Sequence, residues 1–591
     1  MNVFFQVFCA TFSGILTSLA IPNETLRLGS PIFAAVALVP LYIAVRDARS
    51  YKNAAALFAI DALITHLLSS FWLANFKDFA IFTLGASAFG TACIEAMAAC
   101  LFFAPFKKTQ GISKKKIFAQ RASLPSADFS SQNINFKIFW FACVRVIYEW
   151  AKSTGFLAYP WGTLSMGAFR AKALMQSADI FGTYGITFLF AFISGTLAET
   201  IISLRYEKKF ARKEICHCQR CAIFLLACFA IYGAFRLRQE RKVVKTLNAV
   251  LVQQNRDPWV DKDDSESIMT SIELTENGIE EFAEEGTRPD IVVWSEAVLR
   301  SAFPNAYIRY SVRPQDRPLI PFIKESNVPF LIGGSFTLEP KNSRHANSAL
   351  MFDKEGIFRG YYGKTHLVPF AEVIPGVEYP LVSAFMKKVV GFSNGWFPGN
   401  EFTLFELEAD AAEDKGNPPS KIIDLSLDAV SAQKPPERTK VRISTPICFE
   451  DAFPDICGPF HALGAELFLN ITDDSWSKTY SAEYQHFVVA AFRSIEYRTT
   501  LVRSTNSGLT AVVDPYGRIL DSIPLFEKAY LCARIPIFQW QETVYSRYTN
   551  WFVHLILIFM AFVCARTASR IEEKPKRTTL RECVQSALKE I

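Results

Sequence analysis

The feature that most limits what this chain can fold into is a series of apolar stretches long enough to cross, or nearly cross, a bilayer. Seven precede residue 246 and one lies near the C-terminal end. Half of the 591 residues are hydrophobic, a composition unusual for a soluble protein of this size. A straight span needs about 20 residues, so the shorter stretches have soft boundaries. The stretches are 3–21, 30–45, 54–72, 79–104, 136–151, 176–203, 221–235 and 549–564.

The basic residues gather in alternate loops between these stretches. Cytoplasmic loops of membrane proteins carry an excess of Lys and Arg, so the alternation predicts that both termini lie in the cytoplasm. Segment 246–548 then lies on the opposite side, because seven spans precede it. The net charge is only +6, and the basic residues lie in short loops rather than on one face, which argues against nucleic-acid binding. Loops 46–52, 107–121 and 205–220 hold three, six and six Lys or Arg, whereas 22–29 and 73–78 hold one each.

Two sets of charged residues need an explanation within this topology. The stretch 236–245 carries five Lys or Arg on the predicted outer side, which indicates either contact with anionic headgroups or an error in the seventh span. Ionisable groups also lie within the spans, where they often mark function. Arg145 and Glu149 are spaced i, i+4, so we favour mutual neutralisation for this pair. The other such residues are Asp61, His66 and Glu95.

Residues 246–548 have the pattern of one large α/β domain. Short runs rich in Val, Ile and Leu alternate with helix-like stretches at 264–286 and 482–498. Segment 407–438 is polar, contains Pro and lacks periodicity, so we interpret it as an insertion loop. The strand-like runs are 248–255, 290–296, 329–336, 442–450, 466–472, 500–506 and 509–514. Catalytic residues collect where the strands of such folds end, and the residues at these ends include Glu296, Cys448, Asp473 and Asn506.

Cys448 is the residue on which a catalytic interpretation depends. A lone thiol after an apolar strand is most often a buried core residue. To act as a nucleophile it needs a base or a neighbouring cation, because the thiolate is the reactive form. Glu296 could supply the base and Lys364 the positive charge, although each residue alone is typical of a surface charge. The spacing in the sequence does not bring the three residues together.

Three motifs in a fixed order do connect these residues. PDIVVWSEA (289–297), GKTHLVPFAEVIPG (363–376) and ISTPICFED (443–451) resemble the three signature blocks of the nitrilase superfamily. More narrowly, HLVPFAEVIP after the lysine resembles the apolipoprotein N-acyltransferase family, whose members join seven spans, a nitrilase-like domain and a final span. The resemblance covers nearly the whole chain. Supporting segments are TDDSW (472–476), QHFVVAAFRSIEYRTTLVRSTNSG (485–508) and TGFLAYPWG (154–162).

The resemblance implies a fold with two parts. These are a membrane α-helical bundle of about eight spans and an α/β nitrilase-like domain, which is an α-β-β-α sandwich. The expected domains are a seven-span membrane domain at 1–245, a catalytic domain at 246–548, a final transmembrane helix at 549–564 and a cytoplasmic tail at 565–591.

The resemblance also assigns roles by motif. Glu296 matches the general base, Lys364 the oxyanion-stabilising lysine and Cys448 the nucleophile. Phe449 stands where the family usually has Tyr, and its backbone N–H remains available to an oxyanion hole. Four further positions match supporting residues of the family: Glu372 as a second acid, Glu450 as an acid two positions after the nucleophile, Trp476 as a pocket aromatic, and Trp259 as the nearest candidate for an upstream pocket tryptophan.

The implied reaction is a two-step acyl transfer that uses no cofactor or metal. Cys448 takes the sn-1 acyl chain of a phospholipid, with phosphatidylethanolamine as the expected donor, and forms a thioester. The amino group of a diacylglyceryl-cysteine at a bacterial lipoprotein N-terminus then attacks that thioester. The implied location is the bacterial inner membrane, crossed several times, with the catalytic domain on the periplasmic side.

Two other functions remain open. A membrane-tethered nitrilase-type amidase would use water in place of the lipoprotein amine, but such a domain needs no seven-span frame. An inactive lipid-binding membrane protein would have lost the triad, and all three positions are intact. Separately, the run Cys216–Cys221 offers thiols and a histidine, but zinc sites usually pair ligands from two separated segments, so we expect no metal there.

Overall fold

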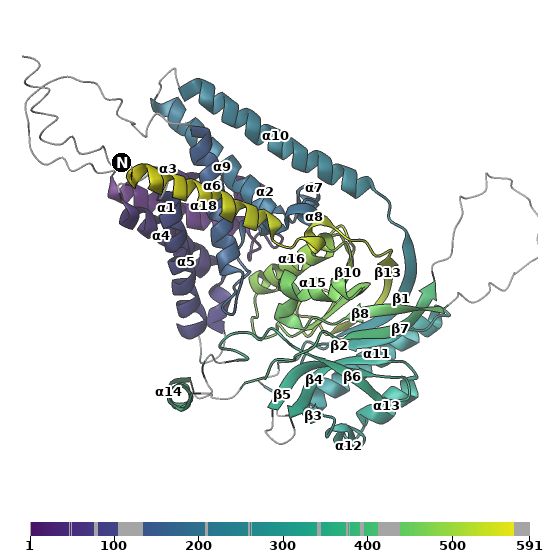
Figure 1. Cartoon of the computed structure of the whole chain (residues 1–591). Helices are drawn as coiled ribbons and strands as arrows, with labels where there is room; N and C mark the ends of the chain where they lie inside the picture. The colour runs from purple at the N-terminus through teal and green to yellow at the C-terminus, as the bar shows by residue number, and fades with distance from the viewer. Residues whose placement is uncertain are drawn as a thin grey trace, which may run out of the picture.

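The computed structural model describes most of the chain. Residues outside the description are 1, 47, 49, 76–80, 104–133, 207–210, 258–259, 262, 340–343, 374–375, 377–378, 391–394, 412–437 and 573–591. Figure 1 shows the helices of the N-terminal part at the upper left and the sheet with its covering helices at the lower right.

The N-terminal part is built from packed helices, joined by one helix from the C-terminal end. Residue Asn2 caps the first of them by accepting a hydrogen bond from Phe4 N. The helices are α1 (Val3–Ala20), α2 (Pro31–Val36), α3 (Val39–Arg46), α4 (Tyr51–Ser69), α5 (Ser87–Phe103), α6 (Ile134–Lys152), α7 (Lys172–Met175), α8 (Ala178–Phe181), α9 (Thr183–Tyr206), α10 (Ala211–Arg238) and α18 (Trp551–Glu572), with η1 (Phe71–Asn75), η2 (Ile81–Ala86) and η5 (Leu164–Ala168) between them.

Every apolar stretch predicted from the sequence contains helix, but not every one is a single long helix. The second predicted span is broken between α2 and α3, and the sixth begins at Thr183 rather than at residue 176. Four helices of the described chain are long and apolar enough to cross a membrane: Val3–Ala20, Thr83–Phe102, Thr183–Arg205 and Glu214–Arg238. Two shorter apolar helices are Pro31–Arg46 and Trp551–Thr567. The chain is therefore a membrane protein by its helices, and the count of eight crossings stays a prediction.

The C-terminal part contains one continuous path of hydrogen-bonded strands. The order along the path is β12-β11-β10-β9-β8-β7-β1-β2-β4-β5-β6, with β13 paired to β1 and β3 to β4. The strands are β1 (Val243–Gln253), β2 (Ile291–Trp294), β3 (Leu299–Phe303), β4 (Phe330–Glu339), β5 (Arg344–Phe352), β6 (Phe358–Gly363), β7 (Leu404–Ala411), β8 (Arg438–Ser444), β9 (Leu467–Thr472), β10 (Thr500–Thr505), β11 (Ala511–Val513), β12 (Ile519–Ser522) and β13 (Ala529–Phe538).

The strand path folds over into two facing layers. Ser504 of β10 donates its hydroxyl to the backbone carbonyls of Val293 at 3.1 Å and Val252 at 3.4 Å, so β10 lies against β1 and β2. Helices cover the two outer faces, which gives the expected α-β-β-α order. They are α11 (Ser265–Glu284), α12 (Tyr307–Tyr310) and α13 (Leu319–Ser326) on one face, and α15 (Pro454–Ala462) and α16 (Tyr480–Glu496) on the other; α14 (Pro380–Val390) stands apart at the lower left of Figure 1, and α17 (Val544–Arg547) precedes α18.

The alternation of β1 separates two hydrophobic cores. Leu247, Ala249 and Leu251 join a core that continues from the strand layers into the N-terminal helices. Val250 and Val252 point the other way, into a smaller core under α11 and α13. Because the larger core contains residues of both parts, the helices and the strand layers are packed as one body rather than as two separately cored units.

The basic stretch 236–245 binds the protein itself. Arg236 pairs with Asp179 at 3.0 Å. Arg241 donates to the carbonyls of Arg498 and Gln539, each at 2.6 Å. These contacts give two of the five basic residues partners within the protein.

The predicted bounds of the insertion loop, 407 and 438, are both wrong, because each lies in a strand. β7 extends to Ala411 and β8 begins at Arg438, because these ends pair with each other across Asp410 and Arg438. The rest of the predicted loop lies outside the described residues.

Candidate active site

The three residues predicted as a catalytic triad come from three strand ends. Glu296 follows β2, Lys364 follows β6, and Cys448 begins the short 3-10 helix η7 (Cys448–Ala452) after β8. The structure brings them together: Lys364 Nζ lies 3.2 Å from Glu296 Oε1, and both charges act on the pKa of the Cys448 thiol. Glu296 and Lys364 are buried, while Cys448 is partly exposed.

Lys364 is the cation at the centre of this group. Its ammonium also lies 2.9 Å from Glu372 Oε1, so it bridges two carboxylates. Burial alone would lower the pKa of Lys364, but Glu296 and Glu372 outweigh burial and raise that pKa well above its usual value. Lys364 therefore carries a fixed positive charge beside the thiol.

Glu296 is held at both carboxylate oxygens. Oε1 accepts from Asn347 Nδ2 at 2.6 Å as well as from Lys364, and Oε2 accepts the backbone N–H of Asp473 at 2.9 Å. Burial raises the pKa of Glu296, and Lys364 works against that rise. A carboxylate with a raised pKa is a stronger base than an exposed one, which suits proton abstraction.

Cys448 is presented in an unusual backbone conformation. Its φ of 50° lies in the left-handed region that residues other than glycine seldom adopt. Burial and the Glu296 carboxylate raise the pKa of the thiol well above its usual value, and Lys364 lowers it. The resting thiol is therefore protonated, and a nucleophilic attack requires a base in the same step.

Glu372 and Glu450, the two predicted supporting acids, both contact the group. Glu372 accepts from Asn347 Nδ2 at 3.1 Å and from the Val368 N–H at 2.8 Å. Glu450 instead connects the turn at Cys448 to the loop after Lys364 by hydrogen bonds. It accepts the backbone N–H groups of Thr365 at 2.7 Å, His366 at 3.0 Å and Ile447 at 2.8 Å, and the hydroxyl of Tyr362 at 2.9 Å.

The aromatic residues near Cys448 come from both parts of the molecule. Phe449 stacks on Trp161, with ring centres 5.1 Å apart and planes 12° apart. Trp476 lies 5.6 Å from Trp72, which in turn lies 6.2 Å from Trp161. Trp72 and Trp161 belong to connections between N-terminal helices, so the helical part forms one wall of the site. The last candidate, Trp259, lies outside the described residues.

Sequence reasoning missed two contributors. Asn347 bridges Glu296 and Glu372, and only the register of β5 and β6 places it beside Lys364, whose N–H donates to the Asn347 carbonyl at 2.8 Å. Trp161 lies in a segment that supported the family resemblance, but nothing in the sequence placed it against Phe449. Asp473 and Asn506, noted as residues at strand ends, do meet: Asn506 Nδ2 donates to Asp473 Oδ1 at 3.0 Å.

The described residues contain no group of three or more His, Cys, Asp or Glu side chains arranged to hold a metal ion. The run Cys216–Cys221 lies on α10. Cys218 Sγ contacts Asn135 Oδ1 at 2.7 Å, and Cys221 Sγ lies 3.6 Å from His217 Nε2.

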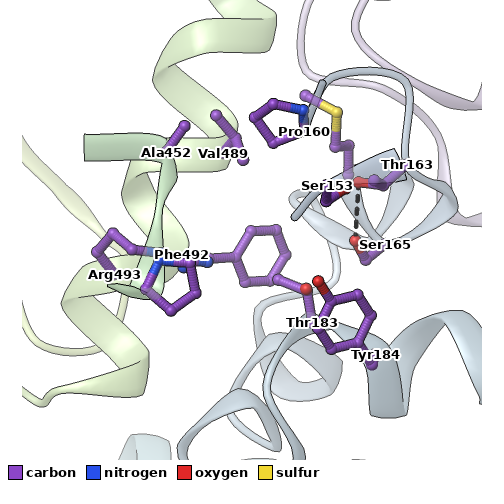
Figure 2. Close-up of a pocket in the computed structure, with 12 residues that line it drawn as sticks. Ser153, Pro160, Thr163, Ser165, Thr183, Tyr184, Ala452, Val489, Phe492 and Arg493 are labelled. Atoms are coloured by element: carbon purple, nitrogen blue, oxygen red, sulfur yellow. Dashed lines mark hydrogen bonds between the residues drawn. The ribbon is translucent and has the colours of Figure 1, made fainter. Parts of the chain in front are cut away.

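A small cavity lies where the helical part meets α16, and Figure 2 shows its walls. Thr163 and Ser165, which share a hydrogen bond of 3.1 Å, form one side of the cavity. Val489 and Phe492 of α16 form another side. Its volume is about 30 Å³, which is room for about two water molecules. None of the triad residues lines it, so the cavity is separate from the candidate site. Its other lining residues are Ser153, Pro160, Met166, Thr183, Tyr184, Ala452, Pro454 and Arg493.

Two family models match the chain, one on each part. The apolipoprotein N-acyltransferase N-terminal domain matches residues 13–196, and the carbon-nitrogen hydrolase domain matches residues 251–545. The second match includes all three triad positions and identifies the strand layers as a nitrilase-type fold.

Similar proteins align over nearly the full length. Apolipoprotein N-acyltransferase 2 of Treponema denticola is 38% identical over 96% of this chain and 99% of its own. The protein of the same name from Treponema pallidum is 34% identical over 93% of each chain. A solved carbon-nitrogen hydrolase from Helicobacter pylori covers 57% of this chain and 99% of its own, with 13% identity and a TM-score of 0.32. That score is too low to argue from, so the fold assignment rests on the family model.

Proposed function

This chain belongs to the apolipoprotein N-acyltransferase family and is an acyltransferase of lipoprotein biosynthesis, and from that premise we propose a two-step transfer through Cys448. The donor is the sn-1 acyl chain of a phospholipid such as phosphatidylethanolamine. The acceptor is the α-amino group of a diacylglyceryl-cysteine at a lipoprotein N-terminus. The observation that carries the proposal is the contact of Lys364 with Glu296 beside a partly exposed thiol.

In the first step, Glu296 takes the Cys448 proton as the sulfur attacks the ester carbonyl. The negative charge that develops on the carbonyl oxygen is stabilised by the Lys364 ammonium and the Phe449 N–H, and such a donor is typically worth about 3–4 kcal/mol. The tetrahedral intermediate collapses, the C–O bond breaks, and Glu296 returns the proton to the leaving lysophospholipid. An acyl-thioester remains on Cys448.

In the second step, the lipoprotein amine attacks the thioester. Glu296 accepts the proton that the amine loses, the C–S bond breaks, and Glu296 passes that proton to the Cys448 thiolate. The raised pKa of Glu296 supports both roles, because a base must take a proton in each half-reaction and give it back. Splitting the transfer in two lets one site serve two lipid substrates in turn.

The acyl-enzyme can be tested with purified full-length protein in detergent. Incubation with phosphatidylethanolamine should add the mass of one acyl chain to the intact protein, and Cys448→Ala should add none. A diacylated lipopeptide should then become triacylated and remove the adduct. An adduct of equal yield on Cys448→Ala would refute the nucleophile, and turnover with water or ammonia but not with the lipopeptide would favour an amidase.

We also propose that segment 246–548 faces the periplasm and that both termini lie in the cytoplasm. The alternation of basic loops supports this orientation. A membrane-impermeant thiol reagent should label Lys354→Cys, at an exposed position of the catalytic domain, in intact spheroplasts. Exposed Cys216, near the start of α10, should react only after lysis. The reverse pattern would overturn the orientation.

A further inference from the structure

A buried histidine lies directly beneath the nucleophile's turn. His486 of α16 has 4% of its side chain exposed. Its Nδ1 lies 2.8 and 3.0 Å from the two carboxylate oxygens of Asp474. Its Nε2 lies 3.1 Å from Asp451 Oδ1 and 3.4 Å from the backbone carbonyl oxygen of Cys448. Both ring nitrogens face only oxygen acceptors, so each must carry a hydrogen, and the ring is an imidazolium.

The charges around His486 support this assignment. Burial lowers the pKa of His486, but Asp474 and Asp451 together more than compensate and raise that pKa to about 9. Arg503 adds a second cation, with Nη1 2.9 Å from Asp451 and Nη2 3.6 Å from Asp474. Burial and the Asp474 carboxylate raise the pKa of the neighbouring Glu483 well above its usual value. Two cations, His486 and Arg503, thus face the carboxylates of Asp451 and Asp474 in a buried site.

The carbonyl that His486 reaches belongs to the strained residue of the site. Cys448 has a φ of 50°, and a left-handed conformation in a residue other than glycine persists only where the surroundings fix it. Two side chains donate toward its carbonyl oxygen: Asn470 Nδ2 at 3.2 Å and His486 Nε2 at 3.4 Å. His486 also holds Asp451, three residues further along the same turn.

The neighbour of His486 anchors α16 to the N-terminal helices. Gln485 Nε2 donates to the carbonyls of Pro22 at 2.9 Å and Ser69 at 2.8 Å. On the His486 side, the Trp161 ring meets the imidazole edge-on at 5.7 Å. The histidine is therefore fixed in place by contacts with the helical part, while its Nε2 reaches the nucleophile's backbone.

We propose that His486 is a positioning residue for the acyl transfer: its Nε2–H holds the Cys448 carbonyl and Asp451, and so fixes the left-handed turn from which the thiol attacks. The proposal rests on the proposed acyl-enzyme at Cys448. In this role His486 acts on the thiol indirectly, through the Cys448 carbonyl and the Asp451 carboxylate.

Two substitutions separate the hydrogen bonds of the two ring nitrogens. In His486→Gln, the side-chain amide can still donate from about the position of Nε2, so the hydrogen bond to Cys448 is kept and the one to Asp474 is lost. In His486→Asn, the shorter amide can donate near the position of Nδ1, so the hydrogen bond to Asp474 is kept and the one to Cys448 is lost. Both variants lose the positive charge equally, so each is a control for the other.

The expected result is an unequal loss of the acylation rate. With purified full-length protein and phosphatidylethanolamine, His486→Asn should slow acyl-enzyme formation about 10- to 100-fold, the loss of one hydrogen bond from a charged donor. His486→Gln should slow it only a few-fold, and the KM for the lipid should be unchanged in both. If the acylation rate and the melting temperature fall equally in the two variants, His486 only balances buried charge, and the positioning role is wrong. Wild-type rates in both would also overturn the proposal.

A lipid-free readout keeps this test separate from the proposed function. Iodoacetamide alkylation of Cys448, followed by peptide mass spectrometry, should slow in His486→Asn more than in His486→Gln, while alkylation of Cys532, a partly buried thiol elsewhere, stays constant. If wild-type protein forms no acyl adduct, the proposed function fails. The relative alkylation rates of Cys448 in wild type and the two variants still test the positioning role of His486. An identical Cys448 rate in wild type and both variants would refute its positioning role.

Discussion

The molecule buries a cation among carboxylates in the helical part and again beside Cys448. In the helices, Arg145 of α6 lies 2.6 Å from Glu95, 3.3 Å from Glu149 and 3.4 Å from Asp61. Beside the thiol, Lys364 lies 2.9 Å from Glu372 and 3.2 Å from Glu296. Both cations are almost completely inaccessible to solvent.

The two clusters differ in their surroundings. The Arg145 cluster lies entirely on helices, and each of its carboxylates is at most 1% exposed. Glu149 is also bound by the Leu164 N–H and the Thr187 hydroxyl. The Lys364 cluster lies at strand ends, next to a partly exposed thiol, and its Glu372 is 14% exposed.

This difference shows that a buried ion pair alone does not indicate catalysis. The pairing expected for Arg145 and Glu149 is confirmed, and it is part of a larger set whose members all face one another. A site of reaction needs, in addition, a nucleophile and an open side. Substitutions in the Lys364 cluster should therefore lower activity more than stability. Substitutions in the Arg145 cluster should lower stability more than activity.

The largest expected effect is on activity, from Lys364→Met. Without the ammonium, the proposed oxyanion loses its charged donor, and the Cys448 thiol loses the cation that lowers its pKa. Loss of a single oxyanion donor costs about 100- to 1,000-fold, so we expect a loss of roughly a thousandfold or more in the rate of acyl-enzyme formation, measured by intact mass against time.

Lys364→Arg is the matched control for charge. It keeps the cation but replaces a point charge with a wider planar group, so partial activity is expected. Activity of Lys364→Met within tenfold of wild type would remove Lys364 from the oxyanion role.

The next effect is on stability, from Arg145→Met. This change leaves three carboxylates together without their cation, and breaking a buried pair typically costs about 3–5 kcal/mol. We expect a clear fall in the melting temperature of the detergent-solubilised protein, and a near-normal acylation rate per folded molecule. Lys440→Met, which removes an exposed pair with Glu406, should leave the melting temperature unchanged. A stable but inactive Arg145→Met would mean that the helical cluster takes part in the reaction.

A smaller effect is expected at Asn347, which lies between the two carboxylates of the active-site cluster. Asn347→Ala removes a hydrogen bond of 2.6 Å to Glu296, and a bond to a charged group is worth about 1.5–3 kcal/mol. The acylation rate should fall about 10- to 100-fold. Asn347→Asp should be worse, because it places a third carboxylate against Glu296 and Glu372. Equal rates for Ala and Asp would show that Asn347 does not orient the base.

The parts of this site that were predicted from the sequence are those carried by ordered motifs. Glu296, Lys364 and Cys448 each occupy a signature block, and the structure brings all three together. Glu372 and Glu450 were placed near the site by the same motifs, and both contact it. The strand-like runs at 248–255 and 500–506 correspond to β1 and β10, because alternating or continuous Val, Ile and Leu is a strong local signal.

Other features depend on contacts between distant segments, which no local pattern encodes. Asn347 of β5 reaches Glu296 only because β5 pairs with β4 and β4 pairs with β2, the strand that Glu296 follows. Trp161 reaches Phe449 only because a connection between helices docks on the catalytic domain. His486, in the middle of α16, was indistinguishable from any buried helix residue until its two ring nitrogens were seen against Asp474 and Cys448.

The smallest expected effect is at Phe449, the position at which the family resemblance leads us to expect Tyr. Phe449→Tyr keeps the ring that stacks on Trp161 at 5.1 Å and leaves the backbone N–H untouched. If the N–H is what serves the oxyanion, the acylation rate should stay within about threefold of wild type, a change of well under 1 kcal/mol.

Phe449→Ala tests the other half of that argument. It keeps the N–H but removes the ring that links the nucleophile's turn to the helical part. Deleting a buried Phe side chain typically costs about 3–5 kcal/mol of stability, so this variant should lower both the melting temperature and the acylation rate. A Phe449→Tyr variant that gains tenfold or more would instead show that the family's hydroxyl takes part in the reaction.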